Sequence, residues 1–193
     1  MNTLKFYIPL IVLAIIISCS PKQQEETNSS GNLYKQQPDS TVLRFLKWYH
    51  QNEEELNTIH FFKGGLNDTT TFYSVDYTNT EIYLARLLSS QCLSNKFIAD
   101  FRNYFIQGDL YLKRHPQNDG PVDGFDYDLI MKSQDYMDVW DNLDSMKTLS
   151  REIIGNKAII KVSFGKYYSP SYNLTNVQGR WLIDSIYNVY NNN

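Results

Sequence analysis

Five aspartates gather in one stretch of the chain, "DGPVDGFDYDLIMKSQD", which spans residues 119–135. They are Asp119, Asp123, Asp126, Asp128 and Asp135. Oxygen-rich loops of this kind can hold Ca²⁺, which takes roughly six to eight oxygen ligands. The spacing does not match an EF-hand loop, which needs ligands at alternating positions, a central glycine and a glutamate at its twelfth position. Aspartate and glycine also make turns and cap the next segment, and this is the role that we expect.

The same stretch holds the residues that would face a ligand if the protein binds one there. These residues are Asp123, Asp126, Asp128, Gln134 and Asp135. We predict no metal ion and no cofactor at this site.

No other pattern identifies a reaction. His50, His60 and His115 lie on separate segments and form no HExxH motif. The chain has no GxSxG, phosphate-binding loop, CxxC or dinucleotide-binding glycine pattern. We therefore assign no catalytic residue from these patterns.

The amino-terminal segment has the features of a secretory signal. One positive charge, at Lys5, precedes an apolar run from Phe6 to Ile17, which is shorter than the roughly 20 residues that span a membrane. The following Ile-Ile-Ser-Cys resembles the bacterial lipobox, which implies cleavage after residue 18 and lipidation of Cys19. An ordinary signal peptide with a chance cysteine and an uncleaved anchor remain as alternatives.

These features predict a protein of the bacterial cell envelope that contacts the membrane through lipid at Cys19. Ser20 follows the cysteine, and its resemblance to enterobacterial sorting signals implies the outer membrane, on either its periplasmic or its surface face. Residues 19–38 are rich in Ser, Gln, Asn and Glu, so we expect a flexible tether. The second cysteine, Cys92, is expected to be a small buried side chain. A net charge of −3 argues against a nucleic-acid partner.

Residues 39–193 suffice for one domain. Helical spacing of Val42, Phe45, Leu46 and Tyr49 predicts a first helix after Asp39 and Ser40. Alternation over 71–77, with Tyr73, Val75 and Tyr77 on one side, predicts a short strand or an extended lead-in. Two further helices are expected, one over 78–91 that begins at Thr78, Asn79 or Thr80, and one that begins at Ser94 and stops near Gly108.

The last third of the chain alternates apolar and polar residues in four runs. We expect one pair of strands around Gly155-Asn156 and another around Gln178-Gly179. Trp181, Ile183 and Tyr187 are predicted to share one face of the last strand. Helices first and an antiparallel meander last indicate an α+β domain.

Three stretches carry a resemblance to a known family: "FLKWYH" at 45–50, "GPVDGFDYDLIMKSQDY" at 120–136 and "GRWLIDSI" at 179–186. They resemble small bacterial lipoproteins and periplasmic proteins with a cystatin-like or NTF2-like domain of unknown function. The resemblance implies N-terminal helices packed on the concave side of a curved antiparallel sheet. It implies no established reaction.

Two functions follow as alternatives. The first is a non-catalytic, lipid-tethered module that binds a small apolar molecule or another protein, and an immunity protein is one version of it. The second is a small carboxylate-dependent hydrolase or isomerase in which Asp126, Asp184 and Tyr187 meet in an NTF2-like cavity. The absence of a nucleophile–base pattern favours the first.

Overall fold

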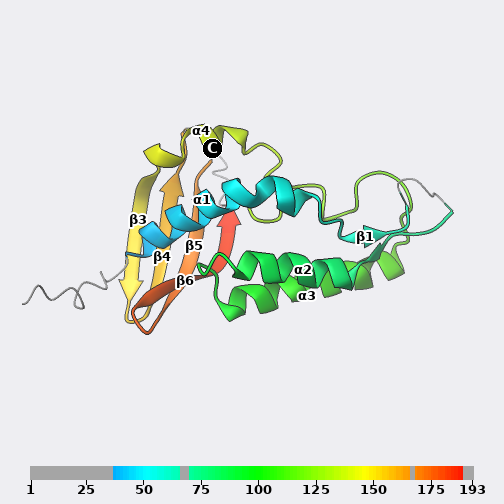
Figure 1. Ribbon diagram of the computed structural model, residues 1–193, viewed down its shortest axis with the longest axis horizontal. Helices are drawn as coiled ribbons and strands as arrows, with labels where there is room; N and C mark the ends of the chain where they lie inside the picture. Colours follow the sequence, from blue (N-terminus) through cyan, green and yellow to red (C-terminus); the bar gives the residue numbers. More distant parts are fainter. Residues whose placement is uncertain (1–36, 66–69, 166–167, 189–193) are drawn as a thin grey trace, which may run out of the picture. The chain divides into compact units, whose positions relative to one another are not determined.

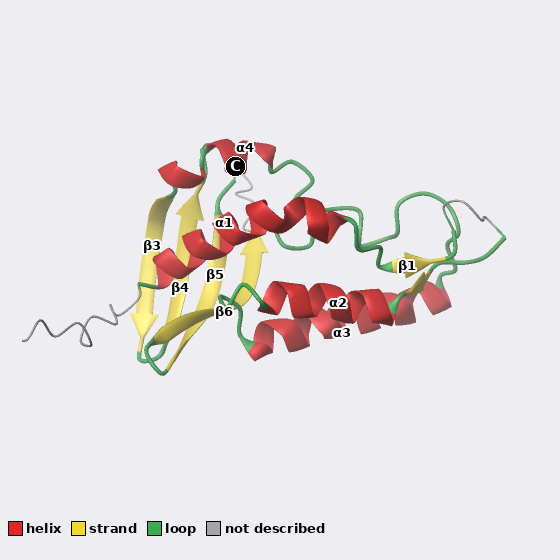
Figure 2. Cartoon of the chain, viewed as in Figure 1, coloured by secondary structure: helices red, strands yellow, loops and turns green. Residues whose placement is uncertain are grey.

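A computed structural model describes residues 37–65, 70–165 and 168–188. The predicted signal peptide, Cys19 and all but the last two residues of the predicted tether lie outside these residues. The helices are α1 (Pro38–Asn57), α2 (Tyr77–Leu88), α3 (Asn95–Arg114), α4 (Met137–Asp141) and the 3-10 turn η1 (Leu143–Ser145) (Figure 1). The strands are β1 (Phe62–Lys63), β2 (Ser74–Val75), β3 (Lys147–Ile154), β4 (Lys157–Ser163), β5 (Pro170–Val177) and β6 (Arg180–Asn188) (Figure 2).

The four C-terminal strands form one antiparallel sheet in the order β3-β4-β5-β6. The predicted meander is therefore confirmed, and so is the α+β class. Its two outer turns contain Gly155 and Gly179, whose φ angles of 60° and 85° favour glycine. β1 and β2 form a separate antiparallel pair.

Helix α1 packs on the sheet through the predicted apolar stripe, since Val42, Phe45, Leu46 and Tyr49 are all buried. It contacts β4 and β6. The Thr41 hydroxyl also donates to the backbone carbonyl of Trp181 in β6, at 3.3 Å. The helix begins at Pro38, one residue inside the predicted tether, because proline suits the first turn of a helix. The prediction of Asp39 or Ser40 as its cap was therefore wrong, since both lie in the first turn and Gln37 is the N-cap.

The segment before α2 contains the expected short strand, but its length and the predicted helix cap were wrong. The expected strand is confined to Ser74–Val75, and Tyr77 already belongs to α2 and is exposed. The cap is Asp76, whose carboxylate accepts the backbone N–H groups of Thr78 and Asn79 at 3.1 and 3.3 Å. An aspartate that ends an extended segment is a strong helix cap, and here it stops the strand as well.

Helix α3 begins after Ser94 as predicted, and the Ser94 hydroxyl accepts the N–H of Phe97 at 3.1 Å. The predicted stop near Gly108 was wrong, because the helix continues to Arg114. A Cβ atom at Gly108 would lie 2.6 Å from the ring of Phe125. This glycine therefore makes room for an aromatic ring.

Strand β6 contains a bulge that reverses the faces of its last residues. Leu174 pairs with Ile183 but Asn173 pairs with Ser185, so Asp184 is an extra residue. Ile186 consequently points into the core beside Ile183, and Tyr187 is 38% exposed. The predicted shared face of Trp181, Ile183 and Tyr187 was wrong for Tyr187.

The core is strongly aromatic along α1, α2 and α3, where Phe105 contacts the rings of Phe61, Phe101 and Phe125. Cys92 is buried as expected, between α2 and α3. Among the described residues no helix has the length and apolarity needed to cross a membrane.

Candidate functional site

The acidic stretch forms a loop between α3 and α4, and Asp128 organises its tightest turn. The Asp128 carboxylate accepts the backbone N–H groups of Ile130 and Met131 at 2.9 and 2.5 Å. Its carbonyl accepts the N–H of Lys132 at 2.7 Å, and Lys132 has a φ of 55°. The expected turn-forming role is therefore present at Asp128.

Two tyrosine–carboxylate hydrogen bonds fasten this region to α1. The Tyr49 hydroxyl donates to Oδ2 of Asp128 at 2.7 Å, and the Tyr136 hydroxyl donates to Oε1 of Glu53 at 2.6 Å. Tyr49 and Glu53 are one helical turn apart, so one face of α1 holds both ends of the segment.

Burial controls the electrostatics around Asp128. Desolvation raises the pKa of Asp128 above its ordinary value, although the hydrogen bonds from Met131, Tyr49 and Ile130 oppose this effect. Burial and the charge of Asp128 also raise the pKa values of Tyr49 and Tyr83. Both phenols therefore stay protonated at neutral pH.

Lys132 lies over a group of aromatic rings. Its Nζ atom is 5.5, 5.4 and 6.0 Å from the ring centroids of Phe101, Tyr104 and Tyr127. Burial lowers the pKa of Lys132, and the nearby Asp128 carboxylate partly offsets this effect. The protein thus already accommodates one cation on aromatic faces beside Asp128.

A cavity of about 720 Å³, here called the Asp128 cavity, lies between this loop, the end of α1 and the β1–β2 pair. Seven Phe or Tyr residues line it: Tyr49, Phe61, Phe62, Tyr73, Tyr83, Phe125 and Tyr127. The other lining residues are Leu56, Asn57, Ile59, His60, Gly64, Gly65, Thr71, Gly120, Pro121, Val122, Asp128 and Leu129. Asp128 is the only carboxylate among these described residues, and none of them is a lysine or an arginine.

A second hollow of about 810 Å³, the Phe125 groove, lies on the other side of the same loop, along α3. It is lined by Tyr104, Gln107, Gly108, Tyr111, Arg114, Pro121, Asp123, Gly124, Phe125 and Asp126. Tyr111 donates to the Asp123 carboxylate at 3.3 Å. Phe125 and Pro121 line both hollows, so the Phe125 ring forms part of the wall between them.

The loop therefore divides the five predicted ligand-facing residues. Asp123 and Asp126 line the Phe125 groove, whereas Asp128 lines the Asp128 cavity. The Gln134 amide donates to the backbone carbonyl of Asp126 at 2.9 Å, and Gln134 lines neither hollow. Asp135 is exposed and its backbone N–H donates to the Ser133 hydroxyl at 3.1 Å, away from both linings.

Sequence reasoning missed most of the cavity's aromatic wall. Tyr49 was predicted on the apolar stripe of the first helix and Tyr73 in the segment 71–77, whereas Phe61 and Phe62 were given no role. A polar hydroxyl on an otherwise apolar helix stripe was the one available signal, because a buried tyrosine usually has a hydrogen-bond partner.

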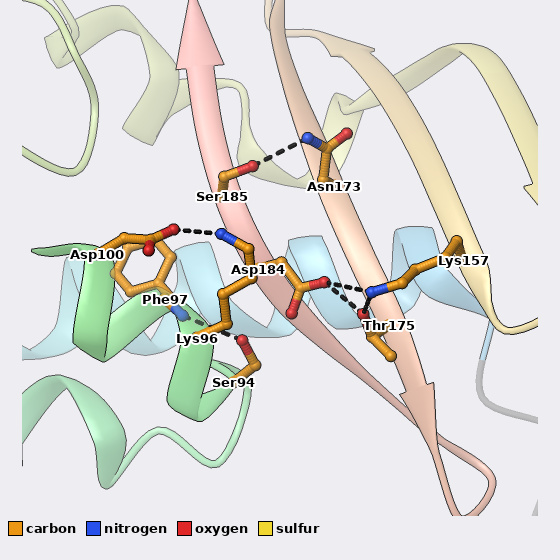
Figure 3. A network of polar contacts seen from close by, with 9 residues as sticks. All are labelled: Ser94, Lys96, Phe97, Asp100, Lys157, Asn173, Thr175, Asp184 and Ser185. Carbon is orange, nitrogen blue, oxygen red and sulfur yellow. Dashed lines mark hydrogen bonds and ion pairs between the residues drawn. The ribbon is translucent and has the colours of Figure 1, made fainter.

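Asp184 belongs to a network of polar side chains on the sheet (Figure 3). It accepts hydrogen bonds from Thr175 and Ser94, and Lys157 Nζ lies 3.3 Å away. Burial works against ionisation, but these partners outweigh it and lower the pKa of Asp184. Asp184 thus joins β6 to β5, to β4 and to the start of α3.

The proposed meeting of Asp126, Asp184 and Tyr187 does not occur. Tyr187 donates to the Asn173 side chain at 3.5 Å on the exposed face of the sheet. Neither Tyr187 nor Asp184 lines either hollow, while Asp126 lines the Phe125 groove. The acid–base arrangement expected for the enzyme alternative is therefore not assembled from these residues.

The three histidines occupy different surroundings. His50 stacks on Trp140 and His115 stacks on Tyr111, with centroid distances of 4.6 and 4.3 Å. His60 lines the Asp128 cavity. Within the described ranges, no three His, Cys, Asp or Glu side chains are grouped so that they could hold a metal ion.

No family model, curated protein or solved structure matches this chain. The resemblance to cystatin-like and NTF2-like lipoproteins accordingly stays a prediction, and the geometry of the site is the basis for a functional proposal.

Proposed function

We propose that this protein is a lipid-anchored, non-catalytic binding module of the bacterial envelope, and that the Asp128 cavity holds a small, mainly aromatic or apolar molecule. The single observation that carries the proposal is the lining of the cavity. Seven Phe or Tyr residues surround one carboxylate that is held by Tyr49 and two backbone N–H groups.

This lining has the composition of a ligand pocket. Small-molecule sites are hollows of about 300–1,000 Å³ with mostly apolar walls and a few fixed polar groups. Asp128 is such a group, because two backbone N–H groups of its own turn and the distant Tyr49 hydroxyl fix its orientation.

The proposed lipid anchor and the proposed cellular location rest on the sequence. The short apolar run that ends at Cys19 supports lipidation there, and the polar tether would then hold the domain away from the membrane. The outer membrane and an NTF2-like fold are parts of the same proposal. Metabolic labelling with a fatty-acid analogue tests the anchor, because Cys19→Ala should abolish incorporation of the label.

The cavity is tested with 2-naphthalenemethanol, a neutral fluorescent alcohol, titrated into the purified full chain. We expect saturable binding that is lost in Asn57→Trp, since Asn57 is an exposed residue of the lining and a bulky side chain there would fill the cavity. Glu54→Trp is the matched control, because Glu54 is exposed on the same helix but absent from the lining.

Equal binding by the two tryptophan variants would locate the probe elsewhere and contradict the proposal. So would a wild-type titration that fails to saturate.

A further inference from the structure

We propose that the Asp128 cavity selects a cationic ligand, an ammonium group carried on an aromatic or apolar body. This inference rests on the proposed function and adds the chemical class of the molecule that the cavity takes.

The first support is the charge balance of the lining. Asp128 is the one carboxylate among the described lining residues, and the lining has no lysine or arginine. The ion pairs among the described residues do not include Asp128, and the one lysine whose charge interacts with it, Lys132, lies outside the lining. A partly buried carboxylate without a directly paired cation favours a ligand that brings one.

The second support is the fixed orientation of the Asp128 carboxylate. It accepts hydrogen bonds from Tyr49, Ile130 and Met131. The Tyr136 hydroxyl interacts with the same carboxylate. These donors fix the carboxylate in place, so an ammonium group would find a preorganised acceptor.

The third support is the aromatic wall. The negative face of a phenol or phenyl ring attracts a cation within about 6 Å of its centroid. Lys132 already lies 6.0 Å from the centroid of Tyr127, which also lines the cavity, and 5.4 Å from that of Tyr104. The charges of Lys132 and Asp128 interact as well. Lys132, these rings and Asp128 therefore form, beside the cavity, the same combination of cation, aromatic faces and carboxylate that we infer for the bound ligand inside it.

A series of three naphthalene compounds tests the charge preference on the full chain. 2-Naphthylmethylamine is an ammonium ion at pH 7, 2-naphthalenemethanol is its neutral counterpart of similar size, and 2-naphthoate is an anion. We expect the ammonium compound to bind about tenfold more tightly than the alcohol, a difference of about 1.4 kcal/mol. The anion should bind at least about tenfold more weakly than the alcohol.

Two variants locate the preference. Asp128→Asn should reduce the ratio of ammonium to alcohol affinity to about one, because the carboxylate supplies most of the preference. Asp123→Asn makes the same change in the same loop but in the Phe125 groove, and it should leave the ratio unchanged.

The possible results separate the two proposals. Binding of the alcohol without a preference for the amine would overturn the cation inference and leave the proposed function standing. Failure of every compound to bind would overturn both. A preference that survives in Asp128→Asn, or disappears in Asp123→Asn, would also refute the inference. If Asp128→Asn does not fold, the order of the three wild-type affinities decides.

Discussion

Two buried tyrosines offer a direct test of the role given to Asp128. Tyr49 is 1% exposed and its hydroxyl donates to Asp128 at 2.7 Å. Tyr172, in β5, is 0% exposed and its hydroxyl has no hydrogen-bond partner among the described residues. Replacement by phenylalanine removes the phenolic oxygen of each tyrosine and leaves both rings in the core.

The expected changes differ in sign. Tyr49→Phe removes a hydrogen-bond donor from a partly buried carboxylate, and the loss of such a hydrogen bond costs about 1–3 kcal/mol of unfolding free energy. Tyr172→Phe removes a buried hydroxyl without a protein partner, and the burial of such a group itself costs roughly 1–3 kcal/mol. We therefore expect Tyr172→Phe to be neutral or to stabilise the protein by up to about 1 kcal/mol.

Urea unfolding followed by far-ultraviolet circular dichroism measures both changes, and an unchanged slope with urea would show that the unfolding reaction is the same. If Tyr49→Phe unfolds within about 0.5 kcal/mol of the wild type, the hydrogen bond to Asp128 has no structural value. That result would refute our explanation of how the carboxylate is held.

Three further changes test other parts of the structure. Trp181→Ala should cost about 3–5 kcal/mol in urea unfolding, because Trp181 is only 7% exposed, and a loss below about 1 kcal/mol would contradict its place in the core. Asp184→Asn should destabilise the protein at pH 7 but progressively less below about pH 4, which urea unfolding at a series of pH values would measure. The pKa of Asp184 is lowered in the folded protein. The stability that its ionised carboxylate contributes is therefore complete above the unfolded pKa and is lost as the pH falls through the folded pKa. Gly108→Ala favours the helix by about 1 kcal/mol but displaces the ring of Phe125, so we expect a net loss of about 0–2 kcal/mol in the free energy of unfolding. A gain of about 1 kcal/mol in urea unfolding would show that the ring moves aside without cost.

Periodicity predicted the elements whose faces are set by burial alone. The stripe of α1 and the alternation of β4 to β6 indicate buried faces, and a buried face requires the same spacing in any compact fold. It failed at Gly108 and Tyr187 because each depends on a distant partner. The helix continues through Gly108 because the ring of Phe125 packs there, and Tyr187 is exposed because the bulge at Asp184 reverses the faces of the strand.

The acidic loop was recognised from sequence, but the sequence did not predict that its aspartates line two different hollows. Asp126 and Asp128 are separated by one residue, yet they line different hollows, because the turn at Asp128 and the ring of Phe125 direct the chain between them. The partners that give Asp128 its surroundings come from far along the chain, such as Tyr49 and Tyr83. One sequence cannot show which distant tyrosine reaches a given carboxylate.

The location of a bound molecule tests the central claim most directly. Intermolecular nuclear Overhauser effects should be recorded between 2-naphthylmethylamine and the aromatic protons of the full chain. We predict cross-peaks to Phe61 and Tyr73, which line only the Asp128 cavity, and none to Tyr111, which lines only the Phe125 groove. Cross-peaks to Tyr111 without any to Phe61 or Tyr73 would contradict the assignment of the Asp128 cavity as the binding site.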